Sequence, residues 1–298
     1  MIVHLVDGTY ELFRHFYGLR RFTQGEDPPF GAVAGVLQTV LQMIEQGATH
    51  LGVATDHVIE SFRNGLWPGY KTSAGVERAL LAQFHPLEDA LVAMGVAVWP
   101  MVELEADDAL ASAAALAARD RNVEKICIWT PDKDLAQCVV GDRVVQVERR
   151  TGVIRGATAV REKFGVDPER IPDYLALVGD TSDGYPGLPG IGKVTAARLV
   201  NRHGALEDFP AEAFGANREL ALLFKDLATL RTTAPLFRTV DALAWRGPTP
   251  AFETLASRFG APRLWTRARA ARPDSTAPAP PPRSRGRQSS KRRPGRPD

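Results

Sequence analysis

The chain has 298 residues, of which 44% are hydrophobic and 24% charged, and its net charge is +2. That length is enough to bury a core in one large domain or two smaller ones. The two cysteines, Cys127 and Cys138, form no CxxC pair, which argues against a zinc–cysteine site and a disulfide framework. No apolar run approaches membrane-spanning length and no secretory signal opens the chain, so we expect a cytoplasmic protein without membrane contact.

The charge is divided unevenly along the chain. Residues 263–298 hold 11 Lys and Arg against two acids, whereas residues 1–262 hold 26 basic and 33 acidic residues. An acidic body indicates a cation site, and a basic tail indicates contact with a polyanion. A tail that only keeps the protein soluble is the alternative. We expect the Pro- and Arg-rich residues 263–298 to be disordered.

Hydrophobic patterning predicts alternating strands and helices. The expected strands are residues 1–6, 50–54, 96–99, 125–130 and 144–147, and the expected helices are 10–17, 32–46, 80–94 and 104–118. Such alternation predicts an α/β fold with a parallel sheet and helices on both faces. The carboxyl ends of parallel strands meet at one edge, where sites form.

Acidic residues collect at that edge. Asp7, Asp56 and the pair Asp132 and Asp134 follow strands directly, and a further group opens the helix after the third strand. One Asp after a strand is an ordinary turn residue, but four segments that each deliver acids indicate a site. The nine candidate ligands are Asp7, Asp56, Glu105, Asp107, Asp108, Asp132, Asp134, Asp180 and Asp183.

These nine carboxylates indicate a particular class of metal. Ligands with only oxygen donors select Mg²⁺ or Mn²⁺ over zinc. Nine acids exceed what one octahedral ion needs, so we expect two ions, arranged as in phosphodiester cleavage. A set of helix caps and turn residues is the alternative, and Asp180 and Asp183 fit a turn best.

A glycine-rich turn follows the acids. Residues 187–193 fit the spacing of a P-loop, but Val194 stands where Ser or Thr binds Mg²⁺ and no strand precedes the turn. Gly190 and Gly192 begin a dinucleotide fingerprint, but Thr195 replaces its last glycine. We expect instead a hairpin between helices whose N–H groups, with Lys193 and Arg198, face a nucleic-acid phosphate. A plain packing element is the alternative.

Taken together, these motifs resemble those of a known family, the bacterial 5′ nucleases. This family comprises the 5′→3′ exonuclease domain of DNA polymerase I and its stand-alone relatives in the flap endonuclease superfamily. The matching segments, in order, are Leu5–Gly8, Asp56, Ser61–Arg63, Gly69–Lys71, Glu105–Asp108, Thr130–Leu135, Gly179–Asp183 and Pro186–Leu199.

The resemblance implies a fold and an activity. It implies a PIN-like core over residues 1–178 with a helical arch at about 63–95, and a helix-hairpin-helix DNA-binding region over 179–262. It also implies Mg²⁺-dependent cleavage of DNA at 5′ flaps, nicks or single-stranded 5′ ends, in replication or repair. We expect a nucleoid-associated monomer that acts alone or with a separate DNA polymerase.

The resemblance also implies roles for residues. One metal site would use Asp7, Asp56, Glu105, Asp107 and Asp108, and the other Asp132, Asp134, Asp180 and Asp183. Lys71 and Arg78 would be catalytic cations of the arch, on one helix face. K⁺ would bind the carbonyls of Leu177, Val178, Pro186, Leu188 and Ile191. The expected DNA contacts are Arg63, Tyr70, Lys71, Gly190, Ile191, Gly192, Lys193, Val194, Thr195 and Arg198.

Two departures from the family pattern stand out. Gly184 replaces the Asn that usually follows the second Asp of GDxSD, and Arg78 is the one basic residue between Lys71 and Met94. A PIN-type ribonuclease would share the carboxylates but not the hairpin. A catalytically silent protein that only binds flap DNA would normally have lost some of the acids.

Overall fold

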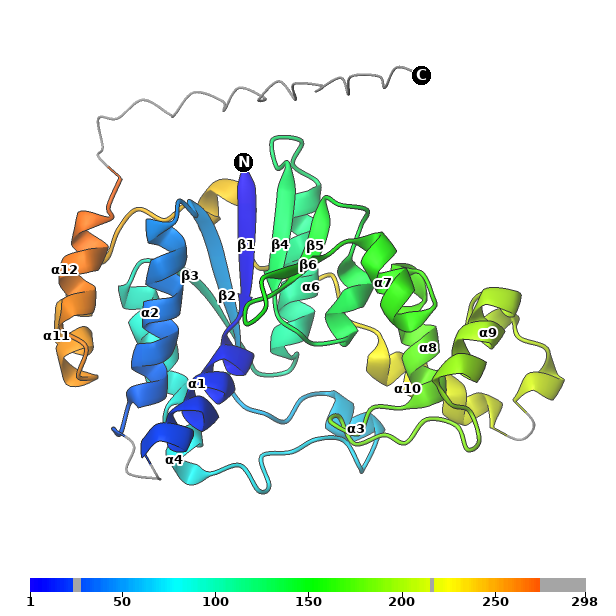
Figure 1. The fold of residues 1–298 in the computed structure, drawn as a ribbon. Helices are drawn as coiled ribbons and strands as arrows, with labels where there is room; N and C mark the ends of the chain where they lie inside the picture. The colour runs from blue at the N-terminus through cyan, green and yellow to red at the C-terminus, as the bar shows by residue number, and fades with distance from the viewer. Residues whose placement is uncertain (24–27, 215–216, 274–298) are drawn as a thin grey trace, which may run out of the picture.

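The computed structural model describes residues 1–23, 28–214 and 217–273. At its centre is a six-stranded sheet in the order β3-β2-β1-β4-β5-β6 (Figure 1). The first five strands are parallel and β6 is antiparallel to β5. The strands are β1 (Ile2–Asp7), β2 (His50–Asp56), β3 (Ala97–Met101), β4 (Lys125–Trp129), β5 (Val144–Glu148) and β6 (Val153–Arg155). The predicted fold class, a mostly parallel sheet with helices on both faces, is confirmed.

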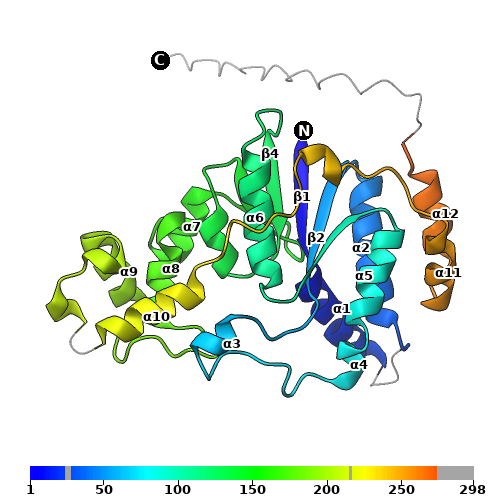
Figure 2. The same ribbon diagram turned by 180° about the vertical axis from the view of Figure 1, so that it is seen from behind.

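Helices cover both faces of the sheet. One face packs against α1 (Gly8–Thr23), α2 (Gly31–Glu45) and α5 (Phe84–Ala93), and the other against the Ala-rich α6 (Ala106–Ala118), seen in Figure 2. The alanines of α6 are small enough to let it lie close to the central strands. The carboxyl ends of β1 and β2 therefore meet the amino end of α6 at one edge of the sheet.

The segment expected to form a helical arch is only partly helical. It contains α3 (Arg63–Leu66), α4 (Arg78–Leu81) and α5, and residues 67–77 form turns and extended backbone below the carboxyl ends of the strands (Figure 1). The expectation that Lys71 and Arg78 share a helix face is therefore wrong. Arg78 opens α4 and is exposed.

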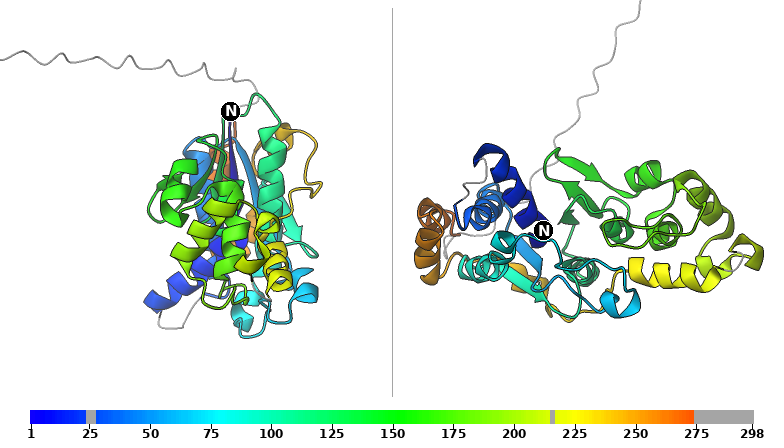
Figure 3. Two further views of the ribbon diagram at one scale, coloured as in Figure 1. Left: turned by 90° about the vertical axis from the view of Figure 1, so that its right-hand side faces the viewer. Right: turned by 90° about the horizontal axis from the view of Figure 1, so that it is seen from below.

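A helical region lies beside the sheet, on the side opposite α11 (Ala251–Arg258) and α12 (Arg263–Ala270), which are coloured orange-brown in Figure 3. Its hairpin joins α8 (Ile171–Val178) to α9 (Lys193–His203), so the first helix of the hairpin precedes the expected boundary at residue 179. The other helices of this region are α7 (Ala157–Phe164), α10 (Arg218–Ala228) and the short 3-10 helices η1 (Asp134–Cys138), η2 (Pro168–Arg170), η3 (Leu206–Asp208) and η4 (Ala211–Ala213).

The chain then returns to the sheet. η5 (Val240–Leu243), α11 (Ala251–Arg258) and α12 (Arg263–Ala270) pack on the core, so residues 240–262 do not belong to the hairpin region. The expectation of disorder from residue 263 is wrong for α12, whose Leu264 is buried and whose Arg267 pairs with Glu45. The rest of the predicted tail, residues 274–298, lies outside the described residues. Across the described ranges, no helix combines the length and apolar character needed to cross a membrane.

Candidate metal centre

The carboxylates that end β1 and β2 are held in place by their neighbours. Asp7 Oδ1 accepts a hydrogen bond from the Tyr10 backbone N–H at 2.8 Å, and Oδ2 accepts one from Thr130 Oγ1 at 3.0 Å. Asp56 Oδ1 accepts the Ala106 N–H at 2.8 Å, at the amino end of α6. Parallel pairing of the two strands thus brings both acids to the same edge of the sheet.

Several of these acids repel one another in the folded protein. Burial, followed by the charges of Asp56 and Asp132, raises the pKa of Asp7 to about 7. Burial and the charges of Asp132 and Asp7 raise the pKa of Asp107. The pKa of Asp134 is raised by burial and by Asp132. Such repulsion costs free energy that a divalent cation would remove.

A second group of acids lies closest together. Ligand oxygens of Asp134, Asp180 and Asp183 all come within 4.8 Å of one another, and the three residues are buried. Asp134 Oδ1 is buried and has no hydrogen-bond partner among the described residues. A buried carboxylate oxygen without a donor is costly, and a cation would satisfy it. This oxygen-only donor set fits a hard divalent ion.

Two lysines form ion pairs with acids of the two groups. Lys71 Nζ lies 2.7 Å from Glu105 Oε2 and 3.1 Å from Asp183 Oδ1, which connects the two groups of acids. Burial alone would lower the pKa of Lys71, but these two carboxylates raise it overall. Lys133 Nζ lies 2.7 Å from Asp180 Oδ2. Lys133 was not among the predicted site residues, although a single lysine inside the acidic motif was a usable signal.

Asp108 has no free oxygen to offer a metal. The Arg63 guanidinium donates to its Oδ2 at 2.7 Å and to its Oδ1 at 2.8 Å. The backbone N–H groups of Glu105 and Arg231 donate to the same oxygens at 3.0 and 2.8 Å. Asp108 is fully buried and closes the capping box of α6. The structure therefore gives Asp108 a place in the wall that holds Glu105, rather than beside the other acids.

Two of the expected DNA contacts are wrong, because their side chains are buried. Arg63 is 1% exposed and also donates to the Leu227 carbonyl at 2.8 Å. Tyr70 is 3% exposed, and its hydroxyl lies 3.3 Å from Glu105 Oε2. Both side chains instead fasten the segment after β2 to the base of the site. Their place in motifs next to the acids predicted proximity, but burial is not readable from a motif.

Gly184 provides the docking point for this segment. Its φ is +85°, and a Cβ at this position would lie 1.9 Å from the Gly69 carbonyl oxygen. The Lys71 N–H donates to the Asp183 carbonyl at 3.0 Å, and Trp67 Nε1 donates to the Gly184 carbonyl at 3.0 Å. The departure from the family pattern at Gly184 thus coincides with a close backbone approach that places Lys71.

The hairpin presents an exposed helix end. Gly190, Gly192 and Lys193 are exposed, Ile191 and Thr195 are partly exposed, and Arg198 is exposed on the second turn of α9. Val194 is 85% exposed, the highest value among the exposed large hydrophobic side chains of the described residues. A close backbone crossing supports this turn, because a Cβ on Gly187 would lie 2.4 Å from the Gly179 nitrogen. The Leu177 carbonyl accepts the Leu188 N–H at 2.9 Å.

Models of known protein families match most of the chain. Residues 2–165 match the family described as "5'-3' exonuclease, N-terminal resolvase-like domain", and residues 166–251 match its "C-terminal SAM fold". The chain is 30% identical over 247 residues to a 5'-3' exonuclease of Buchnera aphidicola subsp. Baizongia pistaciae, covering 76% of this chain and 81% of that protein. It is 36% identical over 260 residues to DNA polymerase I of Pseudomonas aeruginosa, covering 80% of this chain but only 28% of the polymerase.

The fold is also that of a solved nuclease. The bacteriophage T5 flap endonuclease, in a pseudo-enzyme-product complex with DNA and metal ions, matches with a TM-score of 0.61 at 19% identity. That match covers 90% of this chain and the whole of the phage protein. On the family matches and the acidic edge of the sheet, the chain belongs to the 5′–3′ exonuclease family.

Proposed function

We propose that this protein is a Mg²⁺-dependent, structure-specific 5′ nuclease that hydrolyses DNA phosphodiester bonds near 5′ ends with two divalent ions. The observation that carries the proposal is the group formed by Asp134, Asp180 and Asp183, in which Asp134 Oδ1 has no hydrogen-bond partner within the described parts of the chain. Bound ions would lower the pKa of an attacking water and neutralise the charge of the scissile phosphate.

The residues divide into two sets around these ions. Asp7, Asp56 and Asp107 would hold one ion and Asp134, Asp180 and Asp183 the other, with Asp132 electrostatically coupled to both sets. Glu105 lies at the rim of the first set, because Ser61, Arg63 and Lys71 already contact its carboxylate.

Lys71 is the cation best placed to meet the scissile phosphate. It is already drawn to carboxylates of both sets, and 29% of its side chain is exposed. A phosphate that approached the acids would compete for the same ammonium group. Arg78 is exposed at the start of α4 and would contact the substrate farther from the acids.

The α9 end of the hairpin would hold duplex DNA. The N–H groups at the start of α9, with Lys193 and Arg198, would contact backbone phosphates. The carbonyls proposed for K⁺ lie on the same turn, at Leu177, Val178, Pro186, Leu188 and Ile191. The T5 flap endonuclease, which shares this fold, was solved with DNA and metal ions, which supports DNA binding by a chain of this fold.

The proposal includes a setting for this activity. The substrate is DNA with a 5′ flap, a nick or a single-stranded 5′ end. The protein acts as a monomer in the cytoplasm, at the nucleoid, alone or beside a separate DNA polymerase.

Cleavage of three labelled substrates tests this function. A 5′-flap DNA duplex, a matched DNA single strand and an RNA strand are each incubated with Mg²⁺ and with EDTA. We expect Mg²⁺-dependent cuts near the flap junction, and we expect Asp134→Asn to abolish cleavage while flap binding persists. Preferential cleavage of RNA, or flap binding without turnover in any divalent ion, would refute the proposal.

A further inference from the structure

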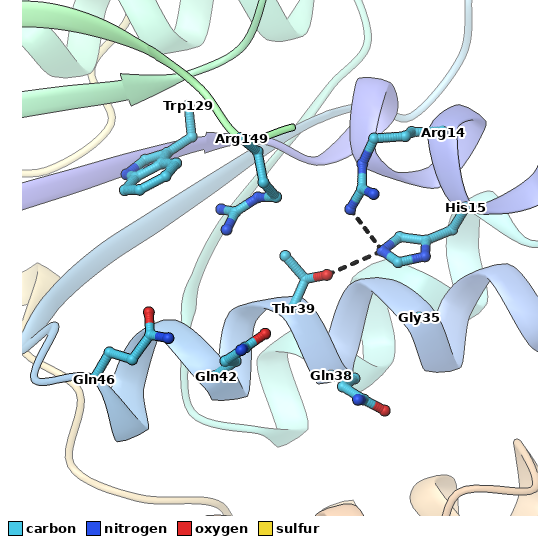
Figure 4. A pocket seen from close by; sticks show the side chains of 9 residues that line it. All are labelled: Arg14, His15, Gly35, Gln38, Thr39, Gln42, Gln46, Trp129 and Arg149. Carbon is cyan, nitrogen blue, oxygen red and sulfur yellow. Dashed lines mark hydrogen bonds between the residues drawn. The ribbon is translucent and has the colours of Figure 1, made fainter. Parts of the chain in front are cut away.

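A pocket of about 630 Å³ lies between α1, α2 and the carboxyl ends of β4 and β5 (Figure 4). A second pocket of about 340 Å³ adjoins it, because Gln46 and Trp129 line both. We call the two joined pockets the α2 groove. Within the described chain, its lining includes none of the nine acids of the metal centre. The volume of the larger pocket is typical of a small-ligand site.

The α2 groove has an excess of positive charge. The fully buried carboxylate of Glu11 accepts hydrogen bonds from Arg14 Nε at 3.1 Å and from Arg149 Nε at 3.0 Å. One carboxylate therefore balances only one of two guanidinium groups. In the described part of the chain, neither Arg14 Nη1 nor Arg149 Nη1 has an acceptor within hydrogen-bonding distance. These free donors suit an anion.

The histidine at this end of the α2 groove is neutral at physiological pH. Burial, followed by the charges of Arg14 and Arg149, lowers the pKa of His15 to about 4. His15 Nε2 lies 2.9 Å from Arg14 Nη2 and 2.9 Å from Thr39 Oγ1, as Figure 4 shows. The ring thus orients the Arg14 guanidinium and adds no charge of its own.

The opposite wall carries amides. Gln38 and Gln42 on α2 and Gln46 at its C-cap lie four residues apart, so they form one exposed stripe along the α2 groove. Across from this stripe, the Arg149 guanidinium lies over the Trp129 ring, 4.5 Å from its centroid (Figure 4). Amides offer both donors and acceptors, which suits the edge of a nucleobase, and an indole or guanidinium plane suits its face.

This combination of groups selects among ligand classes. A site for phosphate alone would need no amide stripe, and a site for an apolar ligand would be lined by aliphatic side chains. We propose that the α2 groove binds a nucleotide unit, with its phosphate at Arg14 and Arg149 and its base along the Gln38–Gln46 stripe. The unit comes either from a free deoxynucleoside monophosphate or from a single DNA strand, and binding needs no divalent ion.

Isothermal titration calorimetry of the full chain in EDTA tests this proposal. The probes are thymidine monophosphate, thymidine, inorganic phosphate and a short thymidine oligomer. We expect the monophosphate to bind more tightly than thymidine or phosphate. A tighter oligomer would identify a strand as the source, and an oligomer that binds no better would identify the free nucleotide.

Two variants and one control localise the binding. Gln42→Glu should weaken nucleotide binding by at least about tenfold, because it adds a negative charge to the α2 groove that repels the bound anion and removes an amide from the stripe that contacts the base. Gln42→Ala should weaken nucleotide binding but leave phosphate binding unchanged. Val92→Glu, which adds the same charge at a 57%-exposed position on α5, should have no effect.

Three results would overturn the proposal: no binding of either nucleotide probe, phosphate binding as tight as nucleotide binding, or normal binding by Gln42→Glu. The test is separable from that of the proposed function. Asp134→Asn should abolish cleavage and leave binding in the α2 groove intact.

Discussion

The buried pair between Arg63 and Asp108 allows a quantitative prediction. Both side chains are at most 1% exposed, and the two guanidinium–carboxylate bonds are 2.7 and 2.8 Å long. Arg63→Met keeps the apolar stem but leaves the Asp108 charge buried without a counter-ion. Removing one partner of a buried ion pair costs about 3–5 kcal/mol. The Leu227 carbonyl also loses its donor.

Equilibrium unfolding in urea, followed by circular dichroism, measures this cost. We expect Arg63→Met to lower the free energy of unfolding by about 3–5 kcal/mol, a large fraction of the total stability of a typical domain. The matched control is Arg267→Met, which breaks a partly exposed ion pair with Glu45 and should cost about 1 kcal/mol or less.

A double variant separates the charge from the packing. If the unpaired Asp108 charge causes the loss, Arg63→Met combined with Asp108→Asn, which removes the charge but keeps an acceptor oxygen for the backbone N–H groups, should recover about 2 kcal/mol relative to Arg63→Met alone. An Arg63→Met variant that loses no more stability than Arg267→Met would refute the reasoning. It would mean that the α6 cap and the segment after β2 hold together without this pair.

Three further predictions concern the metal centre and the hairpin. The folded pKa of Asp7, about 7, lies above its ordinary 3.8, so its contribution to stability is present at low pH and is lost as the pH rises from about 4 to about 7. In EDTA the thermal unfolding midpoint should therefore fall as the pH rises over that range, and added Mg²⁺ should reverse the fall. If the Asp7→Asn variant showed a fall as large as that of the parent protein, Asp7 would not be its cause. Gly184→Ala should lower kcat by at least about tenfold with little loss of duplex binding, because the added Cβ would displace the segment that carries Lys71. An unchanged kcat would show that the close contact between Gly184 and Gly69 is not needed to place Lys71. Val194→Asp should weaken binding of duplex DNA by about tenfold, because it adds a negative charge beside the phosphate contacts. The melting temperature should not change, since Val194 is 85% exposed. An unchanged affinity would mean that the DNA binds elsewhere on the protein.

The sheet was predictable because its signals are local. Each of the five predicted strands is an apolar run that ends at a turn, and Asp7 and Asp56 end two of them, so parallel pairing alone brings the acids to one edge. The short antiparallel strand β6 was not predicted, because its three residues form no apolar run. The hairpin was predictable for the same reason, since a Gly- and Pro-rich turn opens onto an amphipathic helix. Strong local sequence patterns were therefore enough to predict the edge of the sheet at which the acids meet.

The roles of individual acids depend on contacts far apart in the sequence. Asp108 follows Asp107 directly, yet Arg63 lies 45 residues away and neutralises it. Likewise, α12 carries the basic composition of a tail, but Leu264 and the Arg267–Glu45 pair hold it on the core. Such tertiary partners override composition, and a single sequence does not reveal them.

The dependence of cleavage rate on Mg²⁺ concentration tests the two-ion centre most directly. The rate of single-turnover cleavage of a 5′-flap duplex is measured from limiting to saturating Mg²⁺ at fixed ionic strength. Two acid sets that each hold an ion predict a slope of about two in a log–log plot at limiting Mg²⁺. The same plot for Asp134→Asn should show no measurable cleavage. A slope of about one in the parent protein, or cleavage that persists in EDTA, would contradict the two-ion account.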